Sequence, residues 1–219
     1  MQQWGCGCNR FARAGLSRHI RAAPRILASL RREGQIRAMA DAENPATHAF
    51  ERLVPDGDSR SRLVCRDCGF IAYENPKVVV GSVSLWKGRI LLCRRAINPR
   101  NGFWTLPAGY MELNETSVEG ARREAFEEAR ASIEIERLLA VYNIPRLSQV
   151  QLIYLARLVS PDVAAGPESV EVGLFAWEDI PWGEIAFPSV RWALGHYRAG
   201  AGEAHYPVQS NPPGELGNY

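Results

Sequence analysis

From residue 77 to residue 199 the chain alternates apolar stretches with short polar turns, and this pattern predicts most of a mixed sheet. Residues 78–86 are rich in β-branched side chains and predict a strand. Lys87-Gly88 predicts a tight turn, with residues 89–94 as the antiparallel partner. Further strands are expected at residues 103–107, 133–144, 150–159 and 172–177.

Two segments carry helical signals instead. A helix is expected over residues 117–130, because Thr116 and Glu119 have the spacing of a capping box. A second helix is expected over residues 189–198. Strands with helices before and after them predict an α/β layered domain. Residues 200–219 are rich in proline and glycine and predict a flexible tail.

The first helix carries a dense run of acidic residues behind a Pro107-Ala108-Gly109 turn. Glu124, Glu127 and Glu128 are three and four residues apart, so they share one helix face. Carboxylates at this density repel one another unless a cation lies among them, and Mg²⁺ prefers oxygen ligands. A solvated face laced with ion pairs would not require a glycine turn at a fixed distance, so the pattern favours a metal site.

The spacing resembles the Nudix hydrolase signature, G-x5-E-x7-R-E-U-x-E-E-x-G-U, where U is a bulky aliphatic residue. The positions in register are Gly109, Glu115, Arg123, Glu124, Glu127 and Glu128. Three positions depart: small Ala125 and Ala131 occupy U sites, and Arg130 replaces the late glycine. A left-handed helix end there would cost a non-glycine residue roughly 1 kcal/mol. The resemblance covers residues 75–199 and implies a Nudix-type α/β/α sandwich with a mixed sheet.

Nudix enzymes cleave a nucleoside diphosphate linked to another moiety. The resemblance implies that Glu124, Glu127, Glu128 and the Gly109 carbonyl hold Mg²⁺ or Mn²⁺.

The resemblance also suggests roles for Arg123, Glu115 and Glu128, and it leaves the general base open. Arg123 is expected to orient the acidic cluster by pairing with Glu115, and Glu128 to act at the reacting centre. The general base stays open between Glu127, Glu128 and a glutamate on the loop before a late strand. Glu168 and Glu171 both lie on that loop, and Glu171 is the one we name as a catalytic candidate.

Substrate choice depends on weaker signals. Arg94, Arg95 and Arg100 flank the loop that enters the site, and guanidinium groups match phosphate oxygens. Pro145 lies fifteen residues past Arg130, a spacing that resembles the ADP-ribose pyrophosphatase group and related enzymes acting on FAD. The expected reaction is therefore cleavage of ADP-ribose and/or FAD with release of AMP. The alternatives are hydrolysis of NADH or a nucleoside triphosphate, or a non-catalytic ADP-ribose sensor.

A cysteine knuckle precedes this domain. Cys65 and Cys68 form a C-x-x-C-G pattern that resembles half of the zinc ribbon found before some Nudix domains. Structural zinc needs four ligands, and the region about twenty residues earlier contains His48 but no cysteine. We therefore expect residues 39–74 to be a degenerate ribbon-like segment that binds no zinc.

Charge divides the chain unevenly. Residues 1–38 contain eight arginines and one acid and are expected to be a disordered leader, while the rest carries 18 basic and 23 acidic residues. This leader could be an organellar transit peptide, a basic arm for nucleic acid or anionic lipid, or an upstream extension with Met39 as the start. None of the three bears on the chemistry.

Net charge, apolar runs and cysteine content limit the classes of partner and the compartment that we expect. An acidic body argues against a nucleic-acid partner, and no apolar run reaches the ~18 residues of a membrane helix. Five cysteines without a secretory signal fit a reducing compartment, so we expect a cytoplasmic protein, or an organellar one if residues 1–38 are a transit peptide. The expected partner is a nucleotide-derived small molecule, and a homodimer stays open.

Overall fold

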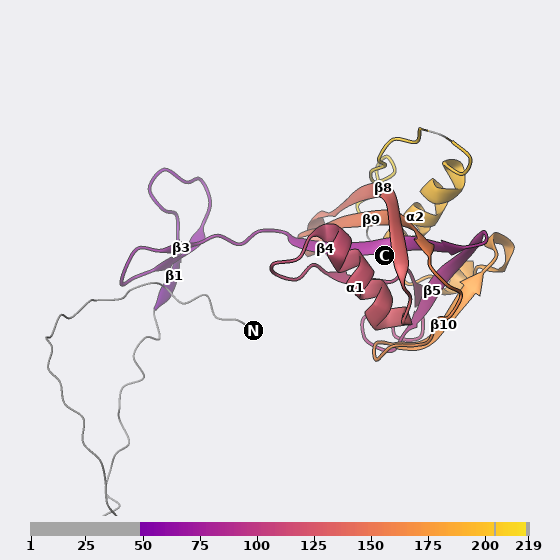
Figure 1. The fold of residues 1–219 in the computed structure, drawn as a ribbon. Coiled ribbons are helices and arrows are strands. Elements are labelled where there is room, and N and C mark those ends of the chain that lie inside the picture. Colours follow the sequence, from indigo (N-terminus) through magenta and orange to yellow (C-terminus); the bar gives the residue numbers. More distant parts are fainter. Residues whose placement is uncertain (1–48, 204, 218–219) are drawn as a thin grey trace, which may run out of the picture. The chain divides into compact units, whose positions relative to one another are not determined.

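The computed structural model describes residues 49–203 and 205–217 and divides the chain after Glu74 into two compact units (Figure 1). The division falls where the sequence pattern placed the start of the larger domain. The expectations for the leader, residues 1–38, and for His48 lie outside the described residues.

The smaller unit is a three-stranded antiparallel sheet in the order β1-β2-β3. The strands are β1 (Phe50–Leu53), β2 (Arg62–Cys65) and β3 (Ile71–Ala72). The knuckle turn is held by backbone bonds, since the Cys65 N–H donates to the Phe70 carbonyl at 2.8 Å and the Gly69 N–H to the Cys65 carbonyl at 2.9 Å. Gly69 has a φ of +74°, which glycine adopts without strain. Cys65 is buried and Cys68 is exposed.

The larger unit is built on a seven-stranded mixed sheet with the path β10-β5-β4-β9-β8, with β6 paired to β5 and β7 to β4. The strands are β4 (Lys77–Trp86), β5 (Arg89–Arg95), β6 (Trp104–Thr105), β7 (Ala108–Tyr110), β8 (Ile133–Ile144), β9 (Gln149–Leu158) and β10 (Ser169–Phe175). Strands β4 and β9 are parallel and the other named pairs antiparallel.

The predicted hairpin between β4 and β5 is confirmed. Lys87 and Gly88 both have positive φ, 47° and 79°, as a two-residue turn of matching twist requires. Short 3₁₀ turns connect later elements, at Pro145–Leu147, Trp177–Asp179 and Trp182–Glu184.

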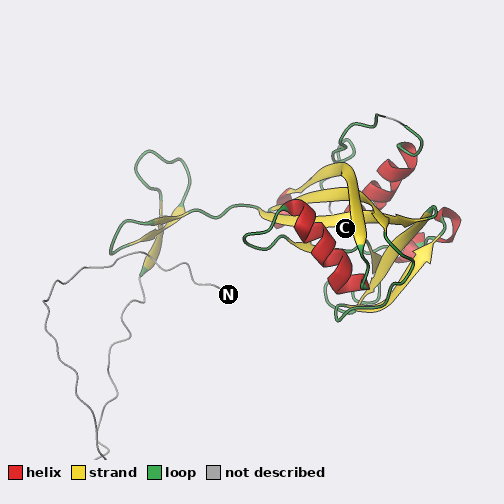
Figure 2. Cartoon of the chain, viewed as in Figure 1, coloured by secondary structure: helices red, strands yellow, loops and turns green. Residues whose placement is uncertain are grey.

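Two helices, α1 (Ser117–Ala129) and α2 (Pro188–Ala199), cover opposite faces of this sheet (Figure 2). Strand β5 shows the division, because successive side chains of a strand point to opposite faces. Ile90 and Leu92 pack in the cluster that contains Leu194 of α2, whereas Leu91 and Cys93 pack with the alanines of α1. The predicted α/β/α sandwich is confirmed. In the described part of the chain, neither helix is long and apolar enough to cross a membrane.

The small residue Ala125 at a U site of the signature belongs to a row of buried alanines on α1. Ala121, Ala125 and Ala129 recur every four residues on α1 and are fully buried against the sheet. Such small side chains let the helix axis approach the strands closely. Arg130 ends the helix in the left-handed conformation, with φ 52° and ψ 22°, so the chain makes the left-handed exit without a glycine.

Residues 205–217, which we predicted to be part of a flexible tail, make specific backbone contacts in the structure. This segment runs along the outer edge of β8: the Val141 N–H donates to the Gln209 carbonyl and the Gln209 N–H to the Leu139 carbonyl, both at 2.9 Å. Proline and glycine content indicates that a segment forms no regular helix or strand. It does not indicate whether the segment packs against another part of the protein.

Candidate active site

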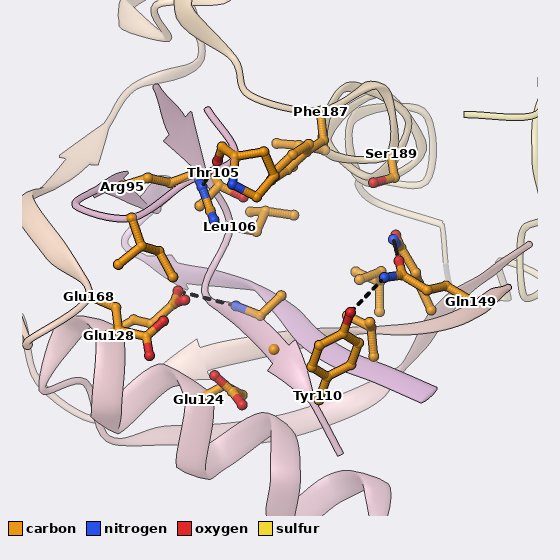
Figure 3. Close-up of a pocket in the computed structure, with 18 of the residues that line it drawn as sticks. Arg95, Thr105, Leu106, Tyr110, Glu124, Glu128, Gln149, Glu168, Phe187 and Ser189 are labelled. Atoms are coloured by element: carbon orange, nitrogen blue, oxygen red, sulfur yellow. Dashed lines mark hydrogen bonds between the residues drawn. The ribbon is translucent and has the colours of Figure 1, made fainter. Parts of the chain in front are cut away.

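A cavity of about 950 Å³ opens in the larger unit beside α1, a size typical of ligand pockets (Figure 3). One end holds the carboxylates of α1, and the other end holds amide and aromatic groups from β7 and β9. The lining includes Arg95, Gly109, Tyr110, Glu124, Glu127, Glu128, Arg130, Ile144, Gln149, Gln151, Glu168, Phe187, Ser189 and Gly217.

Two glycines bring the signature turn against the helix. Strand β4 pairs with β5 at Leu85 and Trp86 but with β7 at residues 79–81. A Cβ on Gly81 would lie 2.4 Å from the Cβ of Ala108, and a Cβ on Gly109 would lie 2.5 Å from Oε1 of Glu124. At Gly81 the backbone of β7 is also within 3.1 Å, so a side chain there would displace the strand. At Gly109 an added Cβ would push the end of the Glu124 side chain away, so glycine there lets the carboxylate lie against β7.

The predicted capping box fixes the start of α1. The Glu119 N–H donates to the Thr116 hydroxyl at 3.2 Å, and the Thr116 N–H donates to the Glu119 carboxylate at 2.7 Å. These reciprocal bonds satisfy backbone donors that the first helical turn leaves open. The helix therefore starts at a defined residue, which sets the rotation of the face that carries the acids.

Arg123 organises this face, and its pairing with Glu115 is as predicted. Its Nε and Nη2 donate to the two carboxylate oxygens of Glu115 at 3.0 and 2.9 Å, and Nη1 donates to Glu124 at 2.7 Å and Glu127 at 2.9 Å. Nη2 also donates to the Tyr110 carbonyl at 3.0 Å. These bonds use all five guanidinium donors. Arg123 is thus a positioning residue, and Glu115, whose pKa is lowered chiefly by its bond from Arg123, is the residue that holds it.

The three helix carboxylates lie in different surroundings. Glu124 and Glu128 are buried and face the cavity, whereas the side chain of Glu127 is 54% exposed. Burial, reinforced by the charge of Glu124, raises the pKa of Glu128 to about 8. Burial also raises the pKa of Glu124, although Arg123 opposes this effect. Two adjacent buried carboxylates are therefore short of positive charge at this end of the cavity.

This donor set fits a hard divalent cation. Arg123 binds one oxygen of Glu124 and one of Glu127, so it leaves the second oxygen of each carboxylate for another partner. Within the described ranges, no three acidic, histidine or cysteine side chains converge closely enough to hold one ion. A bound ion would therefore need water or substrate oxygens to complete its ligands, as Mg²⁺ commonly does, or a rotation of Glu127.

The loop before β10 brings Glu168, and not Glu171, to the cavity. The Ala164 N–H donates to the Ala129 carbonyl at 2.9 Å and the Gly166 N–H to the Glu128 carbonyl at 3.0 Å, so the loop caps the end of α1. Glu168 lines the cavity beside Glu128, and its charge contributes to the raised pKa of Glu128 (Figure 3).

The catalytic candidate Glu171 lies elsewhere. It pairs with Arg94 at 3.4 Å, has a side chain 56% exposed, and does not belong to the cavity lining. This placement, within β10 and away from the cavity, favours Glu168 over Glu171 as the candidate. The irregular register between Ser169 and Glu171 could not be read from the sequence.

The three predicted substrate arginines separate in the same way. Arg95 lines the cavity, with its Nε bonded to the Pro99 carbonyl at 2.9 Å and its guanidinium over the Phe187 ring. Arg94 binds the Gly102 carbonyl and the acids Glu171 and Glu184. Neither Arg94 nor Arg100 belongs to the lining, and the Arg100 guanidinium lies over Phe103.

The far end of the cavity was not predicted. Gln149 donates from Nε2 to the Tyr110 hydroxyl at 3.1 Å, and Gln151 donates to Gln149 at 3.3 Å (Figure 3). The two glutamines alternate with apolar residues at the start of β9, so their side chains share one face. The sequence signal that could have predicted Gln149 and Gln151 as cavity residues was the occurrence of polar residues at every second position of an apolar strand. Phe187 and Ser189, at the start of α2, gave no signal of this kind.

Comparison with known proteins bears on both units. The family model of the NUDIX domain matches residues 75–193, which is more than half of the chain. The chain belongs to the Nudix family. A second model, described as Nudix N-terminal, matches residues 47–74, the smaller unit.

Relatives of this Nudix protein include hydrolases of known structure and activity. A crystal structure of a NUDIX hydrolase from Nitrosomonas europaea is 42% identical, with a TM-score of 0.72, and the match covers 77% of this chain and 97% of that one. An ADP-ribose pyrophosphatase from Methanocaldococcus jannaschii is 29% identical over 52% of this chain and 69% of its own length. A human 8-oxo-dGDP phosphatase is 35% identical over 42% of this chain, which spans only 29% of that relative. The protein is a Nudix pyrophosphohydrolase.

Proposed function

We propose that this Nudix protein uses Mg²⁺ or Mn²⁺ to hydrolyse the pyrophosphate of ADP-ribose and/or FAD, with release of AMP. The observation that carries the proposal is the pair of buried carboxylates, Glu124 and Glu128, at one end of a cavity of about 950 Å³. The ADP-ribose pyrophosphatase among its relatives supports the substrate class.

The metal would be held by Glu124, Glu127 and Glu128, with the Gly109 carbonyl as a further ligand. A divalent cation there supplies positive charge to the phosphate oxygens during attack by water. Arg123 holds Glu124 and Glu127 in place through Nη1, and the Ala108 N–H donates to Glu128 at 3.3 Å. The chain itself thus fixes the carboxylates before substrate arrives, which is what catalysis by a preorganised electrostatic site requires.

Glu168 is our candidate for the base that takes the proton from the attacking water. It faces the same end of the cavity as Glu128 but comes from the loop that caps α1, so it is free of the Arg123 network. Glu127 and Glu128 stay the alternatives. A base must lie within hydrogen-bond reach of the water that it activates, and the placement of Glu168 meets this need better than that of Glu171.

Arg95 would bind a phosphate oxygen of the substrate. Its guanidinium faces the cavity, and its charge partly offsets the raised pKa of Glu128, as expected for a cation at that end of the cavity. The bond to Pro99 and the Phe187 ring fix its direction. An oriented guanidinium loses less freedom when it binds a phosphate than a mobile one does.

The far end of the cavity suits the rest of the substrate. Tyr110, Gln149 and Gln151 offer hydroxyl and amide groups, and Phe187 offers an aromatic surface. Such groups can bind the edges and faces of a nucleobase or the hydroxyls of a ribose. A cavity with an acidic end and a polar aromatic end fits a dinucleotide-like diphosphate.

The test is a substrate panel of ADP-ribose, FAD, NADH, CoA and 8-oxo-dGTP with Mg²⁺ or Mn²⁺, with products separated by chromatography. We expect AMP from ADP-ribose and FAD. A pocket contact is typically worth only ~1–3 kcal/mol, so overlapping activities are expected. If 8-oxo-dGTP gives a monophosphate and pyrophosphate with a kcat/KM about tenfold above both dinucleotides, the substrate assignment is wrong while the catalytic assignment stands. Binding of ADP-ribose without turnover would indicate a sensor.

A further inference from the structure

We propose that residues 205–217, which we call the strap, form one wall of the substrate cavity and set how tightly this Nudix protein holds its substrate. The inference rests on the proposed function, because it concerns the same cavity. It adds a segment that lies beyond α2 and outside the signature.

The strap is attached to β8 as an additional strand would be. Gln209 exchanges backbone hydrogen bonds with Leu139 and Val141, both at 2.9 Å, and forms a parallel bridge to Ala140. Before this bridge, Arg137 donates to the Tyr206 carbonyl at 2.9 Å. Strand β8 ends the path of the sheet, so its outer edge would otherwise present unpaired backbone groups.

Asn211 continues this pairing with its side chain. The Asn143 N–H donates to Oδ1 of Asn211, and Nδ2 of Asn211 donates to the Asn143 carbonyl, both at 2.8 Å. Nδ2 also donates to the Glu215 carbonyl at 3.0 Å. The side-chain amide of Asn211 therefore joins the end of β8 to the later part of the strap, at Glu215. The two prolines that follow, Pro212 and Pro213, have no N–H to continue the ladder.

A turn then returns the chain to the cavity. The Glu215 N–H donates to the Pro212 carbonyl at 3.0 Å, and Gly217, with a φ of +75°, packs on Ile144. A Cβ on Gly217 would lie 2.5 Å from Cδ1 of Ile144. Gly217 is buried and lines the cavity together with Ile144, Leu147 and Gln149.

The position of this wall predicts a particular kinetic effect. Gln149 lies at the end of the cavity opposite Glu128 and Glu168 (Figure 3). The strap therefore supports the surface that would hold the unreactive part of the substrate. An interaction made equally in the ground state and the transition state changes KM and leaves kcat unaltered.

Two glycines of the strap provide a matched test. Gly217→Ala and Gly214→Ala both place a side chain at positive φ, +75° and +80°, but Gly214 has no atom within 4 Å of the added Cβ. With ADP-ribose and Mg²⁺, we expect Gly217→Ala to raise KM about tenfold, with kcat within about twofold of wild type. Gly214→Ala should leave both constants within about twofold. An equal rise of KM in both variants would mean that backbone strain is the cause and would overturn the proposal.

A second pair covers the case in which Gly217→Ala does not fold. Asn211→Ala removes the bonds to Asn143, whereas Gln209→Ala leaves the backbone ladder in place because Gln209 pairs through its main chain. We expect a higher KM only for Asn211→Ala, at similar circular dichroism. An unchanged KM in a folded Asn211→Ala variant would overturn the proposal.

Substrate turnover and the role of the strap are measured separately. The strap variants are measured with ADP-ribose or, if another substrate of the panel is turned over faster, with that substrate. A wild-type protein that turns over none of the panel contradicts the proposed function and, with it, the strap as a substrate wall. If the wild type turns over a substrate but the folded Gly217→Ala and Asn211→Ala variants keep the wild-type KM, only the proposed role of the strap is contradicted.

Discussion

The two units of this Nudix protein differ in what holds their motifs together. In the smaller unit the cysteine knuckle is formed by backbone bonds of Cys65 and Gly69. In the larger unit the acidic face depends on side chains, since Arg123 uses all five donors on neighbouring groups. A turn made by the main chain can persist after its metal ligands are lost. A site made by side chains changes whenever one of them is replaced.

The two units also differ in how deeply the residues of their motifs and strands are buried. Strand β1 of the smaller unit is exposed throughout, and the ion pairs there, such as Arg66 with Glu51, lie on the surface and contribute little to stability. The larger unit buries both Glu124 and Glu128 against a sheet with apolar clusters on both faces. Substitutions in the two units should therefore have very different effects.

The largest effect is expected in the acidic face. Glu127→Gln should lower kcat roughly 100-fold or more, because one ligand charge is lost from a cation that neutralises phosphate. The fold should persist, since the side chain is half exposed. Glu134→Gln is the matched control, because Glu134 is also an exposed glutamate paired with an arginine. Steady-state kinetics decide, and activity of Glu127→Gln within about threefold of wild type would contradict the metal-site assignment.

The next comparison is between the two loop glutamates. Glu168→Gln should lower kcat about 100-fold, the usual order for loss of a general base, while Glu171→Gln should change it less than about twofold. Equal and small effects of both substitutions would return the role of base to the helix carboxylates.

Metal binding should stabilise the larger unit. With an ion at about 100 times its Kd, the free energy of unfolding should rise by about 2.7 kcal/mol, which gives a rise in Tm of several degrees. Thermal melts after treatment with EDTA, with and without Mg²⁺ or Mn²⁺, measure this shift. Glu124→Gln should reduce it, because a buried ligand is removed. A shift of the same size in the variant would place the ion elsewhere.

A smaller effect is expected at the helix start. Thr116→Ala should lower the free energy of unfolding by about 1 kcal/mol at neutral pH, because the capping oxygen is lost. The Thr116 N–H and hydroxyl lower the pKa of Glu119 below its ordinary value of 4.5. This contribution is present above pH 4.5 and is lost as the pH falls through the lowered pKa. The substitution removes only the bond from the Thr116 hydroxyl to Glu119 and keeps the bond from the backbone N–H, so thermal melts should show a slightly smaller difference from wild type in acid. A constant difference would contradict the contribution of the bond from the hydroxyl.

The smallest effect is expected in the cysteine knuckle. Cys68→Ser should change the free energy of unfolding by less than ~0.5 kcal/mol, because Cys68 is exposed and no second cysteine pair occurs in residues 39–74. Elemental analysis of the purified protein should find far less than one zinc per chain. Stoichiometric zinc would mean that ligands come from outside the described residues, from His48 or from a second chain.

Much of the fold could be predicted because its signals are local. The β4–β5 hairpin follows from Lys87-Gly88, the start of α1 from Thr116 and Glu119, and the acidic face from residue spacing alone. The pairing of Arg123 with Glu115 also followed from the motif, because both residues lie within one turn-helix unit.

The placements that the sequence did not predict depend on contacts between segments that are distant in the sequence. Glu168 and Glu171 are the same residue type three positions apart, so the sequence does not distinguish them. Only the capping of α1 by Ala164 and Gly166 places Glu168 at the cavity. The strap looked flexible because its prolines exclude regular structure. It is ordered because β8 has an unpaired edge, and that edge exists only once the sheet has formed.

The sequence by itself determined the acidic face of α1, since residues three and four apart on a helix must share a face. It also determined the glycine turn that such a face requires. Only the tertiary structure decided which arginine and which of Glu168 and Glu171 reach the cavity, and that Gly217 of the strap lines it. Those contacts depend on strand order and loop docking, and these are set by the packing of the whole domain, because no single segment encodes them.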